Sequence, residues 1–118
     1  MYEYKVRRII RTVDGDTIDA EVDLGFGQRG NFRFRLAFVD APEVYGRQAS
    51  TEGVEAKEAA EEWLRVRDGR LMVHTYKGAA ATVGIGDGAF GRWLAAFVDD
   101  EGDDLASHLI RTGHVKEQ

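Results

Sequence analysis

The chain has no cysteine and a single proline, and no apolar stretch in it is long enough to cross a membrane. Without cysteine, neither a disulfide framework nor a thiolate metal site can form. Serine is scarce and falls at predicted helix caps, so nothing resembles a Ser-His-Asp arrangement. The histidines are scattered without metal-ligand spacing, at His74, His108 and His114. These absences argue against disulfide-rich, membrane-spanning, zinc-binding and serine-hydrolase classes.

What the chain does contain is typical of a soluble globular protein. Its 118 residues are 43% hydrophobic and 31% charged, which suits one core. We therefore expect a single domain over residues 1–118 and, by default, a monomer with no membrane partner. The first residues lack the apolar segment of a secretory signal, so we expect a cytoplasmic protein, with secretion left open.

Charge is distributed unevenly along the chain. The net charge is -5, which gives little long-range attraction to nucleic acid. Residues 1–35 nevertheless carry seven Lys or Arg against six Asp or Glu, whereas the remainder carries nine against fifteen. The acidic excess falls mostly on a predicted helix face and on the turn at 99–104, both of which we expect to be solvated. The amino-terminal third is where a polyanion would be tolerated best.

Three β-strands are predicted near the start of the chain. Apolar residues alternate from the second residue, and a change of parity indicates a bulge near Arg7-Arg8. Asp14-Gly15 is a hairpin signal, and residues 17–24 then alternate cleanly between apolar and polar. Three glycines mark a second hairpin, which leads into a strand over 31–39.

The rest of the chain predicts two helices and two more strands. A helix begins at Ser50 or Thr51 and ends near Arg67, with its apolar stripe inward and its glutamates in solvent. Strands follow over 71–76 and 90–98. A short last helix, capped by an aspartate, is expected to bury four apolar residues, Leu105, Ala106, Leu109 and Ile110.

This order of elements predicts a fold class. Five strands with a helix between the third and the fourth is the order of an OB-fold barrel. We therefore predict a mostly β (α+β) fold, a five-stranded OB-fold barrel with one helix between strands 3 and 4 and a short C-terminal helix. The glycine-rich segment 77–89 lacks the Gly-Lys-Ser/Thr ending of a phosphate loop and is predicted to be a connection.

The third predicted strand ends abruptly in charge. Phe34, Leu36 and Phe38 share one parity, so we expect these three side chains in the core. Arg35 has the opposite parity, and its guanidinium is expected to point away from the core. Asp40 follows where the strand should stop. A cation and an anion are therefore expected together at this strand end.

The residues just after this strand suit chemistry on a phosphodiester. Pro42 disfavours a helix in the residue before it, so Asp40 and Glu43 are expected in a bend. Arg35 offers a planar fork of donors for phosphate oxygens. One carboxylate can hold a hard divalent cation, and the second can orient an attacking water. The alternative is a surface strand that ends in a polar turn.

Two further charged residues lie on apolar parities. Asp16 has the inward parity at the start of the second strand, which predicts either a carboxylate at a cavity rim or the completion of the Asp14-Gly15-Asp16 turn. Arg92 shares the parity of Phe90 and Leu94, and a guanidinium there is desolvated unfavourably unless an anion meets it. We therefore predict that Arg92 is a second phosphate ligand or the partner of a buried carboxylate.

Four segments resemble the successive signatures of staphylococcal-nuclease-like (thermonuclease) domains. They are Val-Asp-Gly-Asp-Thr-Ile at 13–18, Phe-Arg-Leu-Ala-Phe-Val-Asp-Ala-Pro-Glu at 34–43, Phe-Gly-Arg-Trp-Leu-Ala at 90–95 and Leu-Ile-Arg-Thr-Gly-His at 109–114. The resemblance is specific because the segments come in the right order and on predicted strand ends. The chain is similar to a short member of that family.

The resemblance implies a Ca2+ site. In such a domain, two carboxylates and a backbone carbonyl would ligate the ion, from Asp16, Asp40 and Ala41. Glu43 would position or deprotonate the attacking water. Ca2+ prefers oxygen ligands and keeps positions open for water and phosphate when the protein supplies only a few.

The resemblance also implies the substrate contacts. Arg35 and Arg92 would clamp the phosphate. Separately from the resemblance, Tyr45 lies beside the site loop and could stack on a base, although a tyrosine in a loop more often serves only packing. The implied activity is hydrolysis of phosphodiester bonds in DNA, RNA or both by direct attack of water. The chain departs from the family pattern at Gly88, where an acidic residue is usual, and at Phe90, which replaces a tyrosine.

Two competing hypotheses belong to another class of protein. The chain could be a catalytically silent OB-fold module that binds nucleic acid or a protein partner, or an interaction domain that Ca2+ merely stabilises. The acidic composition favours these alternatives. The complete set of five charged residues favours the nuclease, because a silent module does not need all of them: Asp16, Arg35, Asp40, Glu43 and Arg92.

Overall fold

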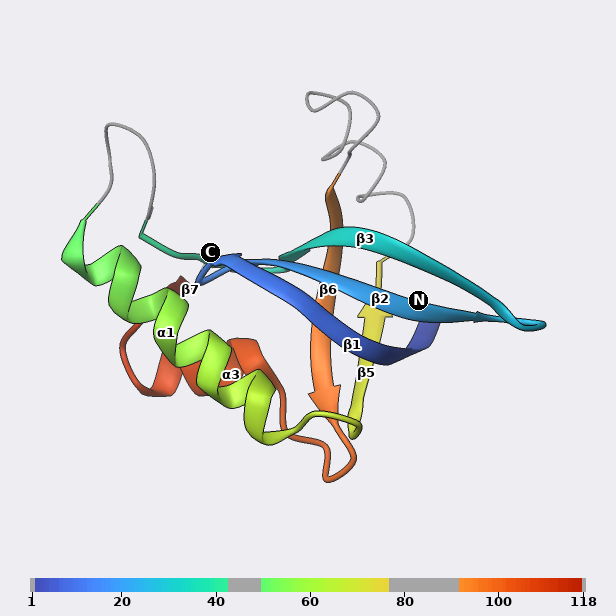
Figure 1. The fold of residues 1–118 in the computed structure, drawn as a ribbon. Helices are drawn as coiled ribbons and strands as arrows, with labels where there is room; N and C mark the ends of the chain where they lie inside the picture. Colours follow the sequence, from blue (N-terminus) through green and yellow to red (C-terminus); the bar gives the residue numbers. More distant parts are fainter. Residues whose placement is uncertain (1, 43–49, 77–91, 118) are drawn as a thin grey trace.

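The computed structural model describes residues 2–42, 50–76 and 92–117, and its longer strands form a closed barrel (Figure 1). These strands are β1 (Tyr2–Asp14), β2 (Thr17–Gly25), β3 (Gln28–Leu36), β5 (Leu71–Thr75) and β6 (Arg92–Asp99). The order around the barrel is β1-β2-β3-β6-β5, and β5 pairs with β1 to close it. All neighbours are antiparallel except β3 and β6, which are parallel. The predicted mostly β architecture with a five-stranded barrel is confirmed.

Two helices and a small second sheet complete the described part of the chain. They are α1 (Thr51–Val66), α3 (Leu105–Arg111), and the paired strands β4 (Val39–Asp40) and β7 (Lys116–Glu117). Both helices lie on one side of the barrel, where α1 packs against β1 and α3 (Figure 1). No helix in the described ranges is both long and apolar enough to cross a membrane.

One core fills the barrel and extends beneath the helices. Phe34 and Phe97 meet edge to face inside it, with ring centroids 5.6 Å apart. The apolar stripe of α1 is buried as predicted, its glutamates are exposed, and Ser50 caps its first turn. In α3, Leu105 and Leu109 are fully buried. Ile110 is 36% exposed, so its predicted burial is wrong, because the short helix turns that side away from the barrel.

β1 bends around the barrel through three irregularities. Its register with β2 shifts after Val6, after Ile9 and after Thr12. Each shift leaves one residue unpaired, so inward-facing residues recur every three positions instead of every two. Val6 and Thr12 are buried, and Ile9 packs against the core. The bulge predicted near Arg7-Arg8 is confirmed, and the other two irregularities were not predicted.

The strand predicted over 31–39 breaks before its expected end. β3 stops at Leu36, and Phe38 takes a positive φ of 67°. Phe38 is 64% exposed, and its ring meets Tyr76 edge to face at 5.6 Å between centroids. Its predicted place in the core is therefore wrong. The turn redirects the chain into β4, where Val39 is buried instead.

Asp99 is buried rather than solvated, which corrects the expectation for the turn that follows β6. Arg67 Nε donates to its Oδ2 at 2.8 Å, and the backbone N–H groups of Glu101 and Asp103 donate to its Oδ1 at 2.9 Å. The Arg67 guanidinium also lies 4.0 Å from the ring centre of Trp63. Burial acts to raise the pKa of Asp99, but these hydrogen bonds outweigh it and hold the pKa below its ordinary value.

We expect Asp99→Asn to lower the melting temperature at pH 7, because a neutral amide leaves the Arg67 charge without its partner. Glu62→Gln is the matched control, since it removes an exposed ion pair with Arg65. Because the pKa of Asp99 is lowered in the folded state, its stabilisation is present above the ordinary aspartate pKa and is lost as pH falls through the folded value. Thermal denaturation of both variants measures this, and equal shifts would contradict it.

Candidate functional site

The turn between β1 and β2 buries a carboxylate. Asp16 is 7% exposed, and its backbone N–H donates to Asp14 Oδ1 at 3.2 Å. Its Oδ1 accepts from the Thr17 hydroxyl at 3.2 Å, and its Oδ2 accepts from the backbone N–H of Ala41 at 3.1 Å. Asp16 therefore completes the turn, as one of the two alternatives predicted, and its carboxylate is also directed at the segment that follows β4.

Gly15 allows the turn to pack closely against its surroundings. A Cβ at this position would lie 2.9 Å from the Cβ of Ala56 on α1 and 3.1 Å from the Cβ of Ala41. Real Cβ atoms do not approach a neighbouring carbon to 2.9 Å, so only glycine fits without displacement. Because Gly15 has no side chain, the turn can approach Ala41 closely enough for the hydrogen bond between Asp16 and Ala41 to form.

Arg35 links the two carboxylates of the site. Its Nη2 lies 2.6 Å from Asp40 Oδ1 and 3.5 Å from Asp16 Oδ2, and it also donates to the carbonyl of Val39 at 3.4 Å. The Arg35 side chain is 19% exposed, whereas that of Asp40 is 56% exposed. The structure therefore brings together Asp16, Arg35, Asp40 and Ala41, and leaves the Asp40 side open to solvent.

The groups around Asp16 do not compensate for the burial of its carboxylate. Burial, together with a hydrogen bond to Asp14 and its charge, raises the pKa of Asp16 from 3.8 to about 7. The N–H of Ala41 and the charge of Arg35 act in the opposite direction without compensating. A hard cation beside this carboxylate would favour its ionised form, so the donor set fits an oxygen-ligated metal such as Ca2+.

Arg92 opens β6, next to the site strand. The parallel register places it opposite Arg33. The same register places Leu94 opposite Arg35, so Arg92 lies one step along from the site. Leu94, which shares the parity of Arg92, is half-buried, whereas Ala95 is fully buried. The side chain of Arg92 lies outside the part of the chain whose side chains are described, so its role as a phosphate ligand or as the partner of a buried carboxylate stays a prediction.

Two predicted site residues, Glu43 and Tyr45, lie outside the described residues. Within 2–42, 50–76 and 92–117, no three acidic or histidine side chains converge as a metal site. Among the described residues, the carboxylates of Asp16 and Asp40 both contact the guanidinium of Arg35. No protein-family model matches the chain, and no curated protein matches it either. The functional hypothesis therefore depends on these residues and their geometry.

The raised pKa of Asp16 predicts a pH-dependent stability in the metal-free protein. Between about pH 4 and pH 7 the folded state binds a proton that the unfolded state has lost, so this group's contribution falls as pH rises and is fully lost above its folded pKa. Asp16→Asn should remove that fall. In chelator, the free energy of unfolding of the variant should therefore gain on the wild type from pH 4.5 to pH 8.

The matched control for this comparison is Asp68→Asn, which removes an exposed carboxylate after α1. Urea denaturation of the three proteins across the pH range measures the effect. A constant difference between Asp16→Asn and the wild type would contradict the role of burial at Asp16.

Proposed function

We propose that this protein is a Ca2+-dependent nuclease that hydrolyses phosphodiester bonds of DNA or RNA. The observation that carries the proposal is the meeting of Asp16, Arg35 and Asp40, which arrive from a hairpin turn, a strand and the segment after that strand. Two carboxylates and a guanidinium at one partly open place are what a metal-assisted phosphodiesterase requires.

The fold supports the proposal at a coarser level. A closed barrel of five strands, with α1 between β4 and β5 in the chain, is compatible with an OB-fold. We propose that the barrel is an OB-fold of the staphylococcal-nuclease-like kind. The four resembling segments contribute the β1–β2 turn, the end of β3, the start of β6 and the end of α3.

Asp16 and Asp40, with the carbonyl of Ala41, would hold the Ca2+ ion. Such an ion accepts about six to eight oxygens, so three protein ligands leave room for waters and a phosphate oxygen. When bound, the ion would polarise the phosphate and stabilise the charge that develops during hydrolysis. The hydrogen bond from Ala41 N–H to Asp16 fixes one of these carboxylates before any ligand arrives.

The chain's own residues would carry the remaining roles. Arg35 has several N–H donors and uses Nη2 for its described contacts with both carboxylates, which supports a role in which its other donors would hold a phosphate oxygen. Glu43 would accept the proton of the attacking water as the new P–O bond forms and the ester P–O bond breaks. Arg92 would supply a second guanidinium, and Tyr45 a stacking surface for a base.

A silent binding module remains the second candidate, and one observation favours it. In this structure Arg35 pairs with both Asp16 and Asp40, so the three charged groups also satisfy one another without any ligand. A binding module with a stabilising ion pair at the strand end would look the same in these residues.

Cleavage of single-stranded DNA and RNA in millimolar Ca2+, compared with the same reaction in chelator, separates the two candidates. We expect Ca2+-dependent cleavage by the wild type. Arg35→Ala should lower the rate by a factor of at least about a hundred, or about 3 to 4 kcal/mol of transition-state stabilisation, as for other preorganised donors. Glu43→Gln should lose a comparable factor.

Arg65→Gln is the control for this assay, because Arg65 is an exposed cation on α1 that pairs with Glu62. All variants should be purified identically, which excludes a contaminating nuclease. A wild type that is as inactive as Arg35→Ala and Glu43→Gln on both nucleic acids would overturn the nuclease proposal.

A further inference from the structure

The outer face of β1, β2 and β3 carries charged residues in rows. The strand registers align Lys5, Asp23 and Arg29 in one row, Arg8, Glu21 and Asn31 in the next, and Arg11, Asp19 and Arg33 in the third. The middle strand supplies the acidic residues and the flanking strands supply the basic ones. We call these residues, together with Arg7 beside Arg8, the basic face.

Cations outnumber anions on the basic face. It contains six Lys or Arg and three Asp or Glu, in a chain whose net charge is -5. Each of two carboxylates is shared between two arginines. Glu21 Oε1 lies 3.7 Å from Arg7 Nε and 3.8 Å from Arg8 Nε, so neither contact is a close hydrogen bond. The positive charge of this pair of arginines is therefore only partly neutralised.

The second shared carboxylate shows the same imbalance. Asp19 accepts two hydrogen bonds from Arg33, at 2.8 and 3.0 Å, and Arg11 Nε lies 3.4 Å away. The side chain of Arg11 is 61% exposed, and that of Arg8 is 58% exposed. These guanidiniums can therefore reach a further anion from solvent without breaking the Arg33 pair.

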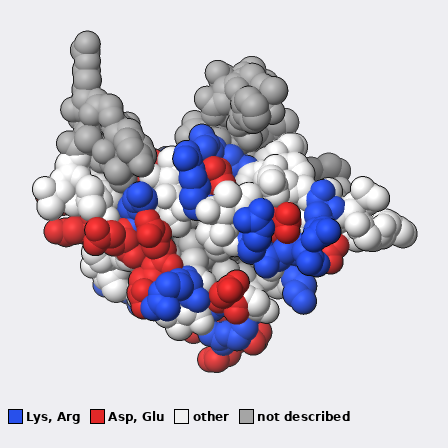
Figure 2. Space-filling model, in the orientation of Figure 1, with Lys and Arg blue, Asp and Glu red and all other residues white. Residues whose placement is uncertain are grey.

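The basic face begins at the candidate site and ends at the β2–β3 hairpin. The row next to Asp19 contains Thr17 and Arg35, and the row that contains Arg29 is nearest the hairpin. Figure 2 shows Lys and Arg gathered over β1–β3, whereas Asp and Glu gather over α1. A nucleic-acid strand that extends from the candidate site would therefore be attracted to the surface over β1–β3 and repelled by the surface over α1.

The tip of the hairpin holds an exposed aromatic residue in an unfavourable conformation. The two-residue loop is Phe26-Gly27, with φ values of 57° and 76°. Such loops favour Asn-Gly, because a bulky side chain is strained at positive φ. Phe26 is nevertheless 103% exposed and packs against nothing. Strain at a residue without a packing role points to an external contact.

We propose that the basic face binds the backbone of a single-stranded nucleic acid and that Phe26 stacks on one of its bases. Charged tracks that end in exposed aromatic rings are how proteins hold single strands with little sequence preference. From Arg35 to the hairpin, β3 is about 25 Å long, which accommodates about four nucleotides. That the bound strand is a substrate rests on the proposed function; that it binds does not.

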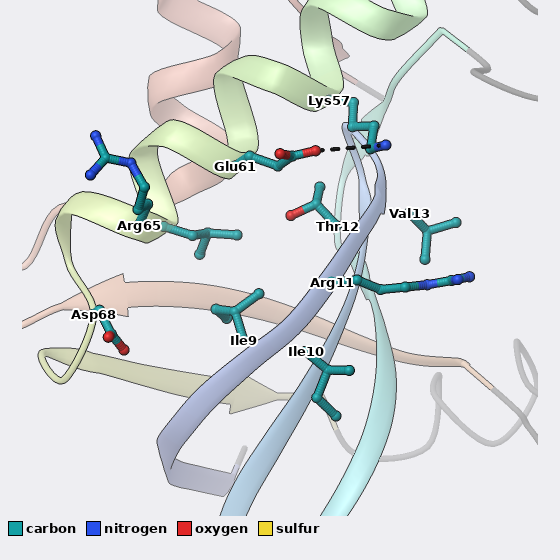
Figure 3. A pocket seen from close by; sticks show the side chains of 10 residues that line it. Ile9, Ile10, Arg11, Thr12, Val13, Lys57, Glu61, Arg65 and Asp68 are labelled. Atoms are coloured by element: carbon teal, nitrogen blue, oxygen red, sulfur yellow. Dashed lines mark ion pairs between the residues drawn. The ribbon is translucent and has the colours of Figure 1, made fainter.

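A groove on another part of the barrel serves as a comparison with the basic face. This groove, of about 600 Å³, lies between β1 and α1 (Figure 3). Apolar side chains such as Ile10 and Val13 form part of its lining, and Lys57 pairs with Glu61 at its rim at 3.7 Å. Two carboxylates, Glu61 and Asp68, lie beside its three cations, one of which is Arg11 of the basic face. The groove supplies residues for a control.

The test is fluorescence anisotropy with a labelled 12-nucleotide oligo(dT) strand and its RNA counterpart, in chelator so that no cleavage occurs. The test variant is the triple change Arg8→Gln, Arg11→Gln and Arg29→Gln. It should bind at least about tenfold more weakly at 50 mM salt, and the slope of log K against log salt should fall by about two. The triple change of the same arginines to Lys should retain the slope. No preference between the DNA and the RNA strand is expected, since the phosphates are common to both.

The matched control removes three cations near α1, through Lys57→Gln, Arg65→Gln and Arg70→Gln. It should bind like the wild type. No measurable binding by the wild type at 50 mM salt, or equal weakening in the test and control triples, would overturn the proposal. Circular dichroism of every variant checks that the barrel is folded.

Phe26→Asn tests the stacking contact with a variant that cannot fail by destabilising the turn. Asn tolerates positive φ, so the melting temperature should stay equal or rise. Affinity for the single strand should fall roughly five- to tenfold without a change in salt slope, because stacking releases no counterions. Affinity for a 12-base-pair duplex should not change. An unchanged single-strand affinity would remove Phe26 from the proposal.

Hydrolysis of a small substrate, thymidine 5′-(p-nitrophenyl phosphate), separates this inference from the proposed function. Such a substrate can occupy the candidate site without reaching Arg8 or Arg29. Oligonucleotide binding that depends on the basic face, with no Ca2+-dependent hydrolysis of either substrate, would support the face and defeat the nuclease. Hydrolysis of the small substrate with no strand binding would do the opposite.

Discussion

The curvature of β1 is the constraint on which the barrel and its outer surface depend. This strand pairs with β2 along most of its length and with β5 through Tyr2–Lys5, so it must bend to join the two. Its three register shifts provide the bend, because each extra residue kinks and twists the strand locally. The same shifts change the spacing between residues that face the same side of β1 from two positions to three. Lys5, Arg8 and Arg11 therefore face outward together, opposite the acidic column of β2.

The candidate site depends on a different constraint, the close approach of two turns. Gly15 contacts α1 and the segment after β4 because it has no Cβ, and this contact buries Asp16 beside Ala41. A buried carboxylate needs compensation, and among the described residues one guanidinium, one backbone N–H and the Thr17 hydroxyl contribute it without offsetting the burial. The pKa of Asp16 accordingly rises to about 7. Ionisable groups shifted in this way are concentrated where proteins bind ligands or perform catalysis.

Much of the fold follows from local signals, and the errors mark where tertiary contacts override them. The Asp14-Gly15 hairpin, the α1 stripe and the meeting of Arg35 with Asp40 were predictable because each depends on neighbours in sequence. Phe38 was misplaced because nothing in a phenylalanine signals a positive φ. The acidic turn was misjudged because the partner that buries Asp99, Arg67, lies 32 positions earlier. The burial of Asp16 required Ala41, which only the folded chain brings near.

The net charge of the chain does not describe the local charge of the basic face. At physiological ionic strength a charge acts over about 8 Å, so the acidic residues over α1 do little to cancel the cations of β1–β3. Two locally unfavourable features lie at the ends of this face, the desolvated Asp16 near Arg35 and the strained Phe26 at the hairpin tip. The Phe26 side chain is fully exposed, and burial disfavours the charged form of Asp16. Conflicts between local preference and fold are expected where a residue binds a ligand. Here the two residues that show such a conflict, Asp16 and Phe26, lie at opposite ends of the basic face.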